Sequence, residues 1–181
     1  MKQKLNIKNI TNAISLGEII LNNNKKSKAT WKIIWYNDAL KYISLENGRI
    51  YIIVSDDEIK KIGCSECKGG MKSTFNFYQS GLGGSPSLRT FGIHHLIYDE
   101  LINNKKILIL GIFNEPIKVN VKGLFNITEE IIYPSIKSME DKCKNDYKSI
   151  YNKFPPWNFQ ENIEEWPENI KQLYKIQVQN R

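Results

Sequence analysis

The sequence predicts a small α+β domain built on a minimal sheet, and three features of the chain indicate this class. Residues 48–63 read GRIYIIVSDDEIKKIG, with two short apolar runs flanking an Asp-Asp pair, which is the pattern of a two-stranded ribbon. Helical patterns follow Pro86 and Pro134, and the short apolar run at 107–113 between them is typical of a strand. The expected order is therefore helix, ribbon, helix, strand, helix.

The first 47 residues form an extension before the ribbon. Residues 9–22 look weakly helical, because Asn and Thr are available there as caps. Residues 22–28 (NNNKKSK) are a polar, charged loop, and residues 31–43 are rich in aromatics and fit a helix or a strand. A turn signal at residues 46–48 leads into the ribbon.

The elements after the ribbon follow from glycine, proline and apolar spacing. Residues 64–85 contain five glycines and predict a long loop. A helix capped by Ser85 begins at Pro86 and runs to about residue 104, and residues 116–124 are extended. Thr128 opens a second helical region with acidic first-turn residues, which Pro134 interrupts. The tail from 159 holds a short helix after Pro167.

Composition bounds the class of protein. The chain has 181 residues, a net charge of +7 and 41% hydrophobic residues, which fits one domain with a real core and favours a polyanionic partner. The plainer reading is that the excess lysine only keeps the protein soluble. No segment approaches a membrane span, and three cysteines give no disulfide framework. We therefore expect a soluble cytoplasmic protein without membrane contact.

Two helices each direct one charged residue toward the domain. On a helical wheel, Arg89 falls within the apolar stripe of the helix after Pro86, His94 lies at its edge, and His95 points away. Arg89 could hold a phosphate, or its head could simply reach solvent. In the later helix Glu140 lies on the margin of the stripe, where the alternative is a solvated carboxylate pairing with Lys144.

Tyr51 and Lys61 lie at the same end of the ribbon. Each alone has an ordinary explanation, as a core tyrosine and a solvated lysine. Together they could form a contact in which the ammonium lowers the pKa of the tyrosine and makes it a usable base. Cys64 and Cys67 form a lone CxxC that could bind zinc with Cys143 and a histidine, but buried or free thiols are favoured.

These residues, in this order, resemble the core of the GIY-YIG nucleases. That family carries Gly-Ile-Tyr on one strand of a hairpin and Tyr-Ile-Gly on the next, then a helix with an essential Arg, a strand, and a helix with a metal-binding Glu. Here the motifs read Arg49-Ile50-Tyr51, preceded by Gly48, and Lys61-Ile62-Gly63. The chain looks closest to small type II restriction endonucleases in which a lysine replaces the second tyrosine.

The resemblance implies a catalytic domain over residues 48–160 with a short three-stranded antiparallel sheet flanked by helices. Residues 1–47 become an N-terminal extension that could recognise DNA, and residues 161–181 a tail packed on or near the core. The chemistry implied is Mg²⁺-dependent (or Mn²⁺-dependent) hydrolysis of a phosphodiester in double-stranded DNA, by a sequence-specific restriction enzyme. A double-strand cut by one site per chain suggests a homodimer.

The resemblance also implies roles for individual residues. Glu140 binds the metal, Tyr51 takes a proton from water with the help of Lys61, and Arg89 stabilises charge on the phosphoryl oxygens. His94 relays a proton or orients Tyr51. The gap before Arg89 is long for the family, so Lys72 is an alternative cation, and Asn158 is either the asparagine that some members use or a helix-stop turn.

Two other classes of function stay open. One is a DNA-binding regulator that keeps the scaffold without cutting, and the other is a protein-interaction module whose basic charge is incidental. An inward-facing Glu beside an Arg favours the nuclease over both.

Overall fold

The computed structural model describes residues 10–24, 29–43, 49–66, 68–113, 117–125 and 127–179, apart from the side chains of residues 132 and 133. The strands are β1 (Ile14–Leu21), β2 (Trp31–Trp35), β3 (Arg49–Ser55), β4 (Glu58–Ser65), β5 (Ile107–Phe113), β6 (Ile117–Lys122) and β7 (Thr128–Tyr133). The helices are the 3₁₀ turn η2 (Asn37–Ala39), α1 (Leu40–Ile43), α2 (Gly70–Gln79), α3 (Leu88–Ile102), α4 (Ile136–Tyr151), α5 (Phe159–Asn162) and α6 (Glu168–Gln179).

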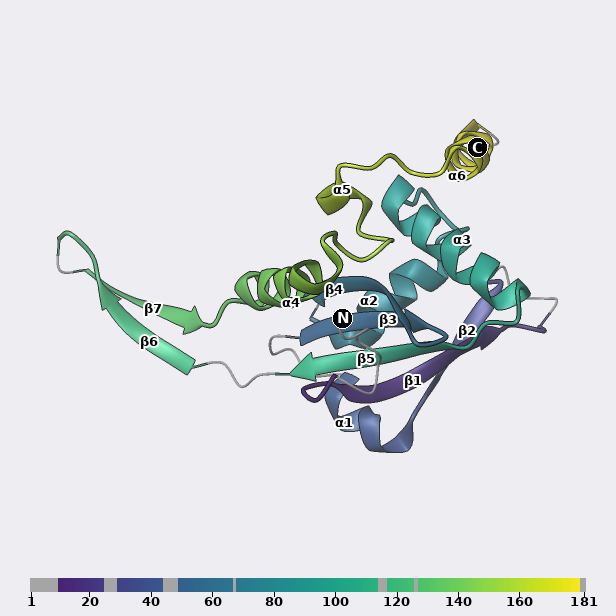
Figure 1. The fold of residues 1–181 in the computed structure, drawn as a ribbon. Helices are drawn as coiled ribbons and strands as arrows, with labels where there is room; N and C mark the ends of the chain where they lie inside the picture. Colours follow the sequence, from purple (N-terminus) through teal and green to yellow (C-terminus); the bar gives the residue numbers. More distant parts are fainter. Residues whose placement is uncertain are drawn as a thin grey trace.

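The central sheet has five strands in the order β2-β1-β5-β3-β4, and each neighbouring pair is antiparallel (Figure 1). The expected three-stranded sheet was therefore too small, because the N-terminal segment supplies β1 and β2. The weak helix expected at 9–22 was wrong: residues 14–21 are a strand that pairs with β2 on one side and β5 on the other. These distant partners, and the β-branched residues of the segment, outweigh its local caps.

The predicted ribbon is confirmed as the β3–β4 pair. Asp56 and Asp57 form the turn with φ angles of 45° and 43°, the left-handed geometry that tight hairpins require and that Asp tolerates. The Asp56 carboxylate accepts a hydrogen bond from the backbone N–H of Lys106 at 2.9 Å. All seven residues of β3 are buried, so this strand forms the centre of the domain.

Helices cover both faces of the sheet (Figure 1). On one face α2 and α3 pack over a core that includes Tyr51, Ile53, Phe75, Ile93 and Ile97. On the other face α4 packs over β3 and β4, against a second core formed by Ile50, Ile52, Val54, Met139 and Tyr147 among others. Helix α6 packs on α3. The alternation of β3 thus sends Tyr51 to one core and its two neighbours to the other.

Two other expectations were wrong. The segment 64–85 is not a long loop, because α2 occupies residues 70–79 and buries Met71, Phe75 and Tyr78 at helical spacing. The helical region expected from Thr128 is β7, which pairs with β6; its β-branched run outweighs the acidic residues that mimic a helix start.

Helices α3, α4 and α6 agree with the sequence patterns. Helix α3 begins two residues later than expected, and the Ser87 hydroxyl, rather than Ser85, accepts the capping hydrogen bond from the Thr90 N–H at 3.2 Å. Helices α4 and α6 lie where the spacing predicted them. Every described helix is too short or too polar to cross a membrane.

Candidate active site

Tyr51 occupies a space that Gly63 leaves open. The two residues are paired across β3 and β4, and a Cβ atom at position 63 would collide with the ring and hydroxyl of Tyr51. The tyrosine side chain therefore lies across the neighbouring strand and is fully buried. A larger residue at position 63 would displace it.

The Tyr51 hydroxyl belongs to a small hydrogen-bonded group. Its oxygen lies 2.7 Å from the hydroxyl oxygen of Tyr78 in α2, and the guanidinium of Arg89 is close enough to both hydroxyls to influence them electrostatically. Arg89 lies in the first turn of α3 and remains exposed to solvent, while its guanidinium interacts with the two tyrosines. Arg89 is therefore near Tyr51, but it is exposed rather than buried in the apolar stripe where the helical wheel placed it.

The expected pKa shift of Tyr51 was wrong in direction and in partner. Burial raises the pKa of Tyr51 well above its ordinary value, and the neighbouring Tyr78 adds to this, while Arg89 opposes it without reversing it. Lys61 is not among the principal influences on this hydroxyl. The tyrosine is a protonated hydrogen-bond donor at neutral pH.

Lys61 projects from β4 to the same face of the sheet as Tyr51, because it pairs with Ile53. It is 4% exposed, and its Nζ donates a hydrogen bond to the Trp157 carbonyl at 3.4 Å. Burial, reinforced by repulsion from Arg89 and opposed by Glu161, lowers the pKa of Lys61 to about 7. A large fraction of this amine is therefore neutral near physiological pH, in contrast to the solvated lysine of the plainer reading.

A small cavity of about 80 Å³ opens beside these two cations. Lys61 and Arg89 line it together with Trp157, Phe159, Glu161 and Trp166 of the segment that follows α4. The Arg89 guanidinium and the Lys61 amine are both hydrogen-bond donors at this cavity, which favours a ligand that carries several acceptor oxygens.

Glu140 belongs to α4, which covers the opposite face of the sheet from Tyr51 and packs on the edge strand β4. The thiol of Cys64, which points to the α4 face of the sheet, contacts its carboxylate. One Glu140 oxygen lies 2.6 Å from Lys144 Nζ and the other 3.1 Å from Lys137 Nζ. Lys144 is buried and also pairs with Glu161, so a carboxylate–ammonium–carboxylate bridge connects Glu140 to the cavity.

The charge state of Glu140 follows from these contacts. Burial works to raise its pKa, but hydrogen bonds from Lys144, Cys64 and Lys137 outweigh burial and lower it. The carboxylate is thus ionised at neutral pH. The pair with Lys144 considered from the sequence is present, but it is buried rather than solvated.

Asn158 clamps the segment after α4 onto the free edge of β4. Its Oδ1 accepts from the Ile62 N–H at 3.0 Å, and its Nδ2 donates to the Ile62 carbonyl at 2.9 Å. The preceding residue adds a third bond, from the Trp157 N–H to the Lys60 carbonyl at 2.8 Å. Asn158 therefore positions the carbonyl that Lys61 contacts.

The other candidates lie apart from this cluster. The His94 Nδ1–H donates to the Tyr78 carbonyl, and the Thr30 hydroxyl donates to its Nε2, both at 2.9 Å. Burial lowers the pKa of His94 to about 4. Its connection to Tyr51 thus runs through the backbone of Tyr78. Lys72 is exposed on α2, and Cys67 lies outside the described residues.

The cysteines bear on metal binding. Cys64 and Cys143 are free thiols, and burial, with the help of Glu140, raises the pKa of Cys64 to about 12. Among the described residues, no group of three or more His, Cys, Asp or Glu side chains converges as a metal site.

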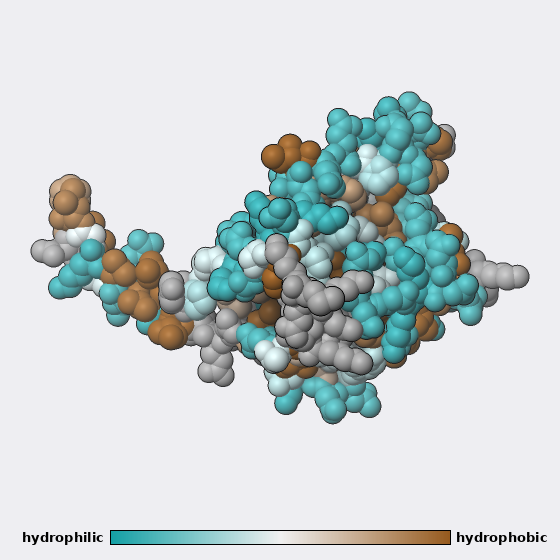
Figure 2. Space-filling view, viewed as in Figure 1, coloured by the Kyte–Doolittle hydropathy of each residue, from teal (hydrophilic) through white to brown (hydrophobic). Residues whose placement is uncertain are grey.

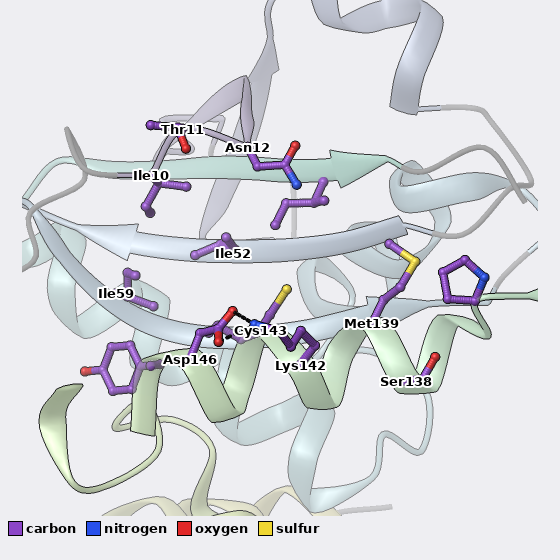
Figure 3. Close-up of a pocket in the computed structure, with 14 residues that line it drawn as sticks. Ile10, Thr11, Asn12, Ile52, Ile59, Ser138, Met139, Lys142, Cys143 and Asp146 are labelled. Atoms are coloured by element: carbon purple, nitrogen blue, oxygen red, sulfur yellow. Dashed lines mark hydrogen bonds and ion pairs between the residues drawn. The ribbon is translucent and has the colours of Figure 1, made fainter. Parts of the chain in front are cut away.

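A larger cavity of about 680 Å³ lies on the opposite face of the sheet, between α4 and the segment at residues 10–12 (Figure 3). Ile52, Ile59 and Met139 point into it, and Lys142 and Asp146 pair with each other on α4 at its margin. Its lining is mainly apolar, and the Tyr51 cluster is on the other side of β3 and β4. The cluster of Tyr51, Lys61 and Arg89 is therefore separate from this larger cavity.

Sequence reasoning missed Tyr78, Glu161 and Trp157. Tyr78 was hidden because its segment was taken as a loop, although Phe75 and Tyr78 share a helical stripe with Met71. Nothing in the sequence indicates that residues 157–161 fold back over β4, because that contact joins residues 96 positions apart.

No protein-family model matches the chain, and no curated protein matches it. Two of the solved structures to which it is similar are nucleases. One is a mutant of EndoII from bacteriophage T4, with a TM-score of 0.51 and 19% identity over 86% of this chain and 99% of that one. The other is the restriction endonuclease HPY188I in complex with product DNA, with a TM-score of 0.48 and 21% identity over 85% and 86% of the two chains. The chain shares the fold of EndoII.

Proposed function

We propose that this chain is a metal-dependent DNA endonuclease of the GIY-YIG type that hydrolyses phosphodiester bonds. The observation that carries the proposal is the cavity that Arg89 and the buried Lys61 line together, with Arg89 also close to the Tyr51 hydroxyl behind it. A guanidinium and a buried amine at one cavity suit a phosphodiester, whose oxygens accept hydrogen bonds and gain charge in the transition state. The fold shared with EndoII supports the same reading.

The donor set around Glu140 fits Mg²⁺ or Mn²⁺ of the kind held by one or two carboxylates together with phosphate oxygens and water. Glu140 is ionised, and Lys137, which holds one of its oxygens, is 63% exposed in its side chain and free to move away. Glu161 is the second carboxylate within reach through Lys144. When bound, the metal supplies Lewis-acid polarisation of the phosphate.

The other side chains of the site transfer the proton, position neighbouring groups and stabilise the developing charge. Lys61, as the neutral amine, accepts the proton of the attacking water, and Tyr51, which is fully buried, helps to position the Arg89 guanidinium. Arg89 stabilises the charge that develops on the phosphoryl group. His94 contributes by holding Tyr78, and through it the orientation of Tyr51, rather than by carrying a proton.

Double-stranded DNA is the proposed substrate. The net charge of +7 suits a polyanion, and Lys72 is an exposed cation on α2 that can contact the backbone. A sequence-specific type II restriction activity, in which Mg²⁺ is required and two copies cut the two strands, is the form we propose.

The test is a cleavage assay on supercoiled and linear DNA, with Mg²⁺ or with EDTA. We expect discrete Mg²⁺-dependent fragments from the wild type, and none from Glu140→Ala or Arg89→Ala. The matched control is Asp141→Ala, which removes an exposed carboxylate from the next position of α4 and should cut normally.

Each outcome separates two readings. Full cleavage by Glu140→Ala would disprove the metal assignment. Intact DNA binding without cleavage of any DNA sequence would replace the nuclease with the non-cleaving regulator. Random degradation in place of discrete fragments would keep the nuclease and remove the restriction role.

A further inference from the structure

The buried ammonium of Lys144 lies between two carboxylates from different parts of the chain. Its Nζ is 2.6 Å from Glu140 Oε1, one turn earlier on α4, and it also contacts Glu161 Oε1 on α5, 17 residues further along. Lys144 is 4% exposed and Glu140 is 5% exposed. The lysine therefore joins α4 to the segment that lines the small cavity.

This buried pair differs from the solvated ion pairs of α4. Lys142 and Asp146 have the same four-residue spacing, but their side chains are 73% and 62% exposed, and Figure 2 shows mainly hydrophilic residues over this helix. Solvated pairs of this kind contribute little to stability. Removing one partner of a buried pair, in contrast, leaves a charge without compensation, so the position of Glu140 depends on Lys144.

The other contacts of Glu140 do not replace Lys144. The second Glu140 oxygen lies 3.1 Å from Nζ of Lys137, whose side chain is 63% exposed, and the thiol of Cys64 is the other close group. An exposed lysine exchanges its partners with water easily. Glu140 therefore has one oxygen that an incoming metal can reach and one that a buried ammonium keeps occupied.

An ammonium and a divalent cation compete for the same carboxylate. A carboxylate oxygen accepts only a limited number of partners, and the hydrogen bond from Lys144 takes up part of that capacity at Oε1. The positive charge of the lysine also repels a second cation, and this repulsion is screened less in a buried place than in water. Coordination of a metal by both oxygens of Glu140 thus works against the contact with Lys144.

We propose that Lys144 is a built-in cation of the metal site: it holds Glu140 and Glu161 in place while no metal is bound, and its charge limits how tightly Glu140 binds the metal. The inference rests on the proposed function in one respect, the assignment of Glu140 as the metal ligand. Lys144 is a positioning residue, because it acts through the two carboxylates. Its charge sets the metal concentration at which the site fills.

The test is Mn²⁺ binding by the full chain without DNA, measured by electron paramagnetic resonance of the free ion. Only binding that Glu140→Ala abolishes is counted. Lys144→Met keeps an unbranched side chain but removes the charge, and we expect it to bind Mn²⁺ at least about tenfold more tightly than the wild type. Lys142→Met removes an exposed lysine from the same helix and should leave the affinity unchanged.

Thermal unfolding gives a second readout that does not depend on activity. In EDTA, Lys144→Met should unfold at a lower temperature than the wild type, because two carboxylates lose their shared partner, and Mn²⁺ should narrow this difference. If Lys144→Met does not fold, the same change is made in a Glu161→Gln background, where one carboxylate fewer is left without a partner. The double variant should bind Mn²⁺ more tightly than Glu161→Gln alone.

The inference and the proposed function can fail separately. Equal Mn²⁺ affinities with and without Lys144 would overturn the inference, even where the chain cuts DNA in a Mg²⁺-dependent way. A stability difference that Mn²⁺ does not narrow would overturn it too, and so would the absence of any Mn²⁺ binding that depends on Glu140. Tighter Mn²⁺ binding by Lys144→Met in a chain that cuts no DNA would support the inference and remove the nuclease.

Discussion

Replacing Asn158 by alanine tests whether this residue acts as a structural clamp or in the chemistry. β4 is an edge strand, so the outward N–H and C=O of Ile62 have no neighbouring strand, and the Asn158 side chain pairs both, at 3.0 and 2.9 Å. Asn158 is 2% exposed, and alanine would leave both backbone groups unpaired in a buried place. At about 1–3 kcal/mol for each unsatisfied group, the loss is about 2–4 kcal/mol once some water enters.

The assay is urea denaturation and a thermal scan of both proteins. For a chain of this size, the expected loss lowers Tm by roughly 5–15 °C. The matched control is Asn145→Ala on α4, where the asparagine is exposed, and its stability should change by less than about 0.5 kcal/mol.

The clamp reading also predicts how function changes. Trp157, whose carbonyl accepts from Lys61, is held on β4 by the same segment, so loosening it exposes Lys61 and moves its pKa back toward the ordinary value. Cleavage by Asn158→Ala should then fall at neutral pH and recover as the pH is raised. Unchanged stability with complete loss of cleavage at every pH would refute the clamp and put Asn158 among the catalytic groups.

Three further predictions follow from the site. Gly63→Ala should reduce cleavage on the order of 10²-fold, because the added methyl displaces the Tyr51 ring; retention of full activity would contradict the packing described here. Lys61→Met should stabilise the protein at a pH of about 6 but much less at about 10. The reason is that the lowered pKa makes burial of the ammonium costly below about 7, and this cost disappears as the pH rises toward the unfolded pKa; urea titrations at both pH values measure it. Glu161→Gln should retain more Mg²⁺-dependent cleavage than Glu140→Gln in a metal titration, and the reverse order would move the principal metal ligand to Glu161.

The parts of the fold that the sequence predicted are those encoded locally. The β3–β4 ribbon was recognisable because its two strands and its Asp-Asp turn lie within 18 residues, from position 48 to 65, and α4 because its apolar spacing runs without a break. β1 was missed because its pairing partners lie in β2 and in β5, far along the chain. α2 was missed because the glycines at its two ends outweighed the spacing of Met71, Phe75 and Tyr78.

The site shows the same division between what is local and what is not. Tyr51, Lys61 and Arg89 could be selected from residue type and helical or strand position, and the structure brings these three together. Their protonation could not be predicted that way, because the sequence reasoning weighed only the attraction between a phenolate and an ammonium. Burial acts on both groups in opposite directions: it raises the pKa of the tyrosine and lowers that of the lysine.

The burial of Lys61 depends on a contact that no local pattern encodes. Residues 157–161 fold back across β4, cover the amine and line the cavity with Trp157 and Glu161. Without that segment the ammonium would be solvated, its pKa would return toward 10.5, and at neutral pH almost no neutral amine would be present to accept a proton. The base that we propose, Lys61 instead of Tyr51, therefore depends on tertiary structure, and the proposal requires a cleavage rate that rises through a pH of about 7 in the wild type but not in Lys61→Met.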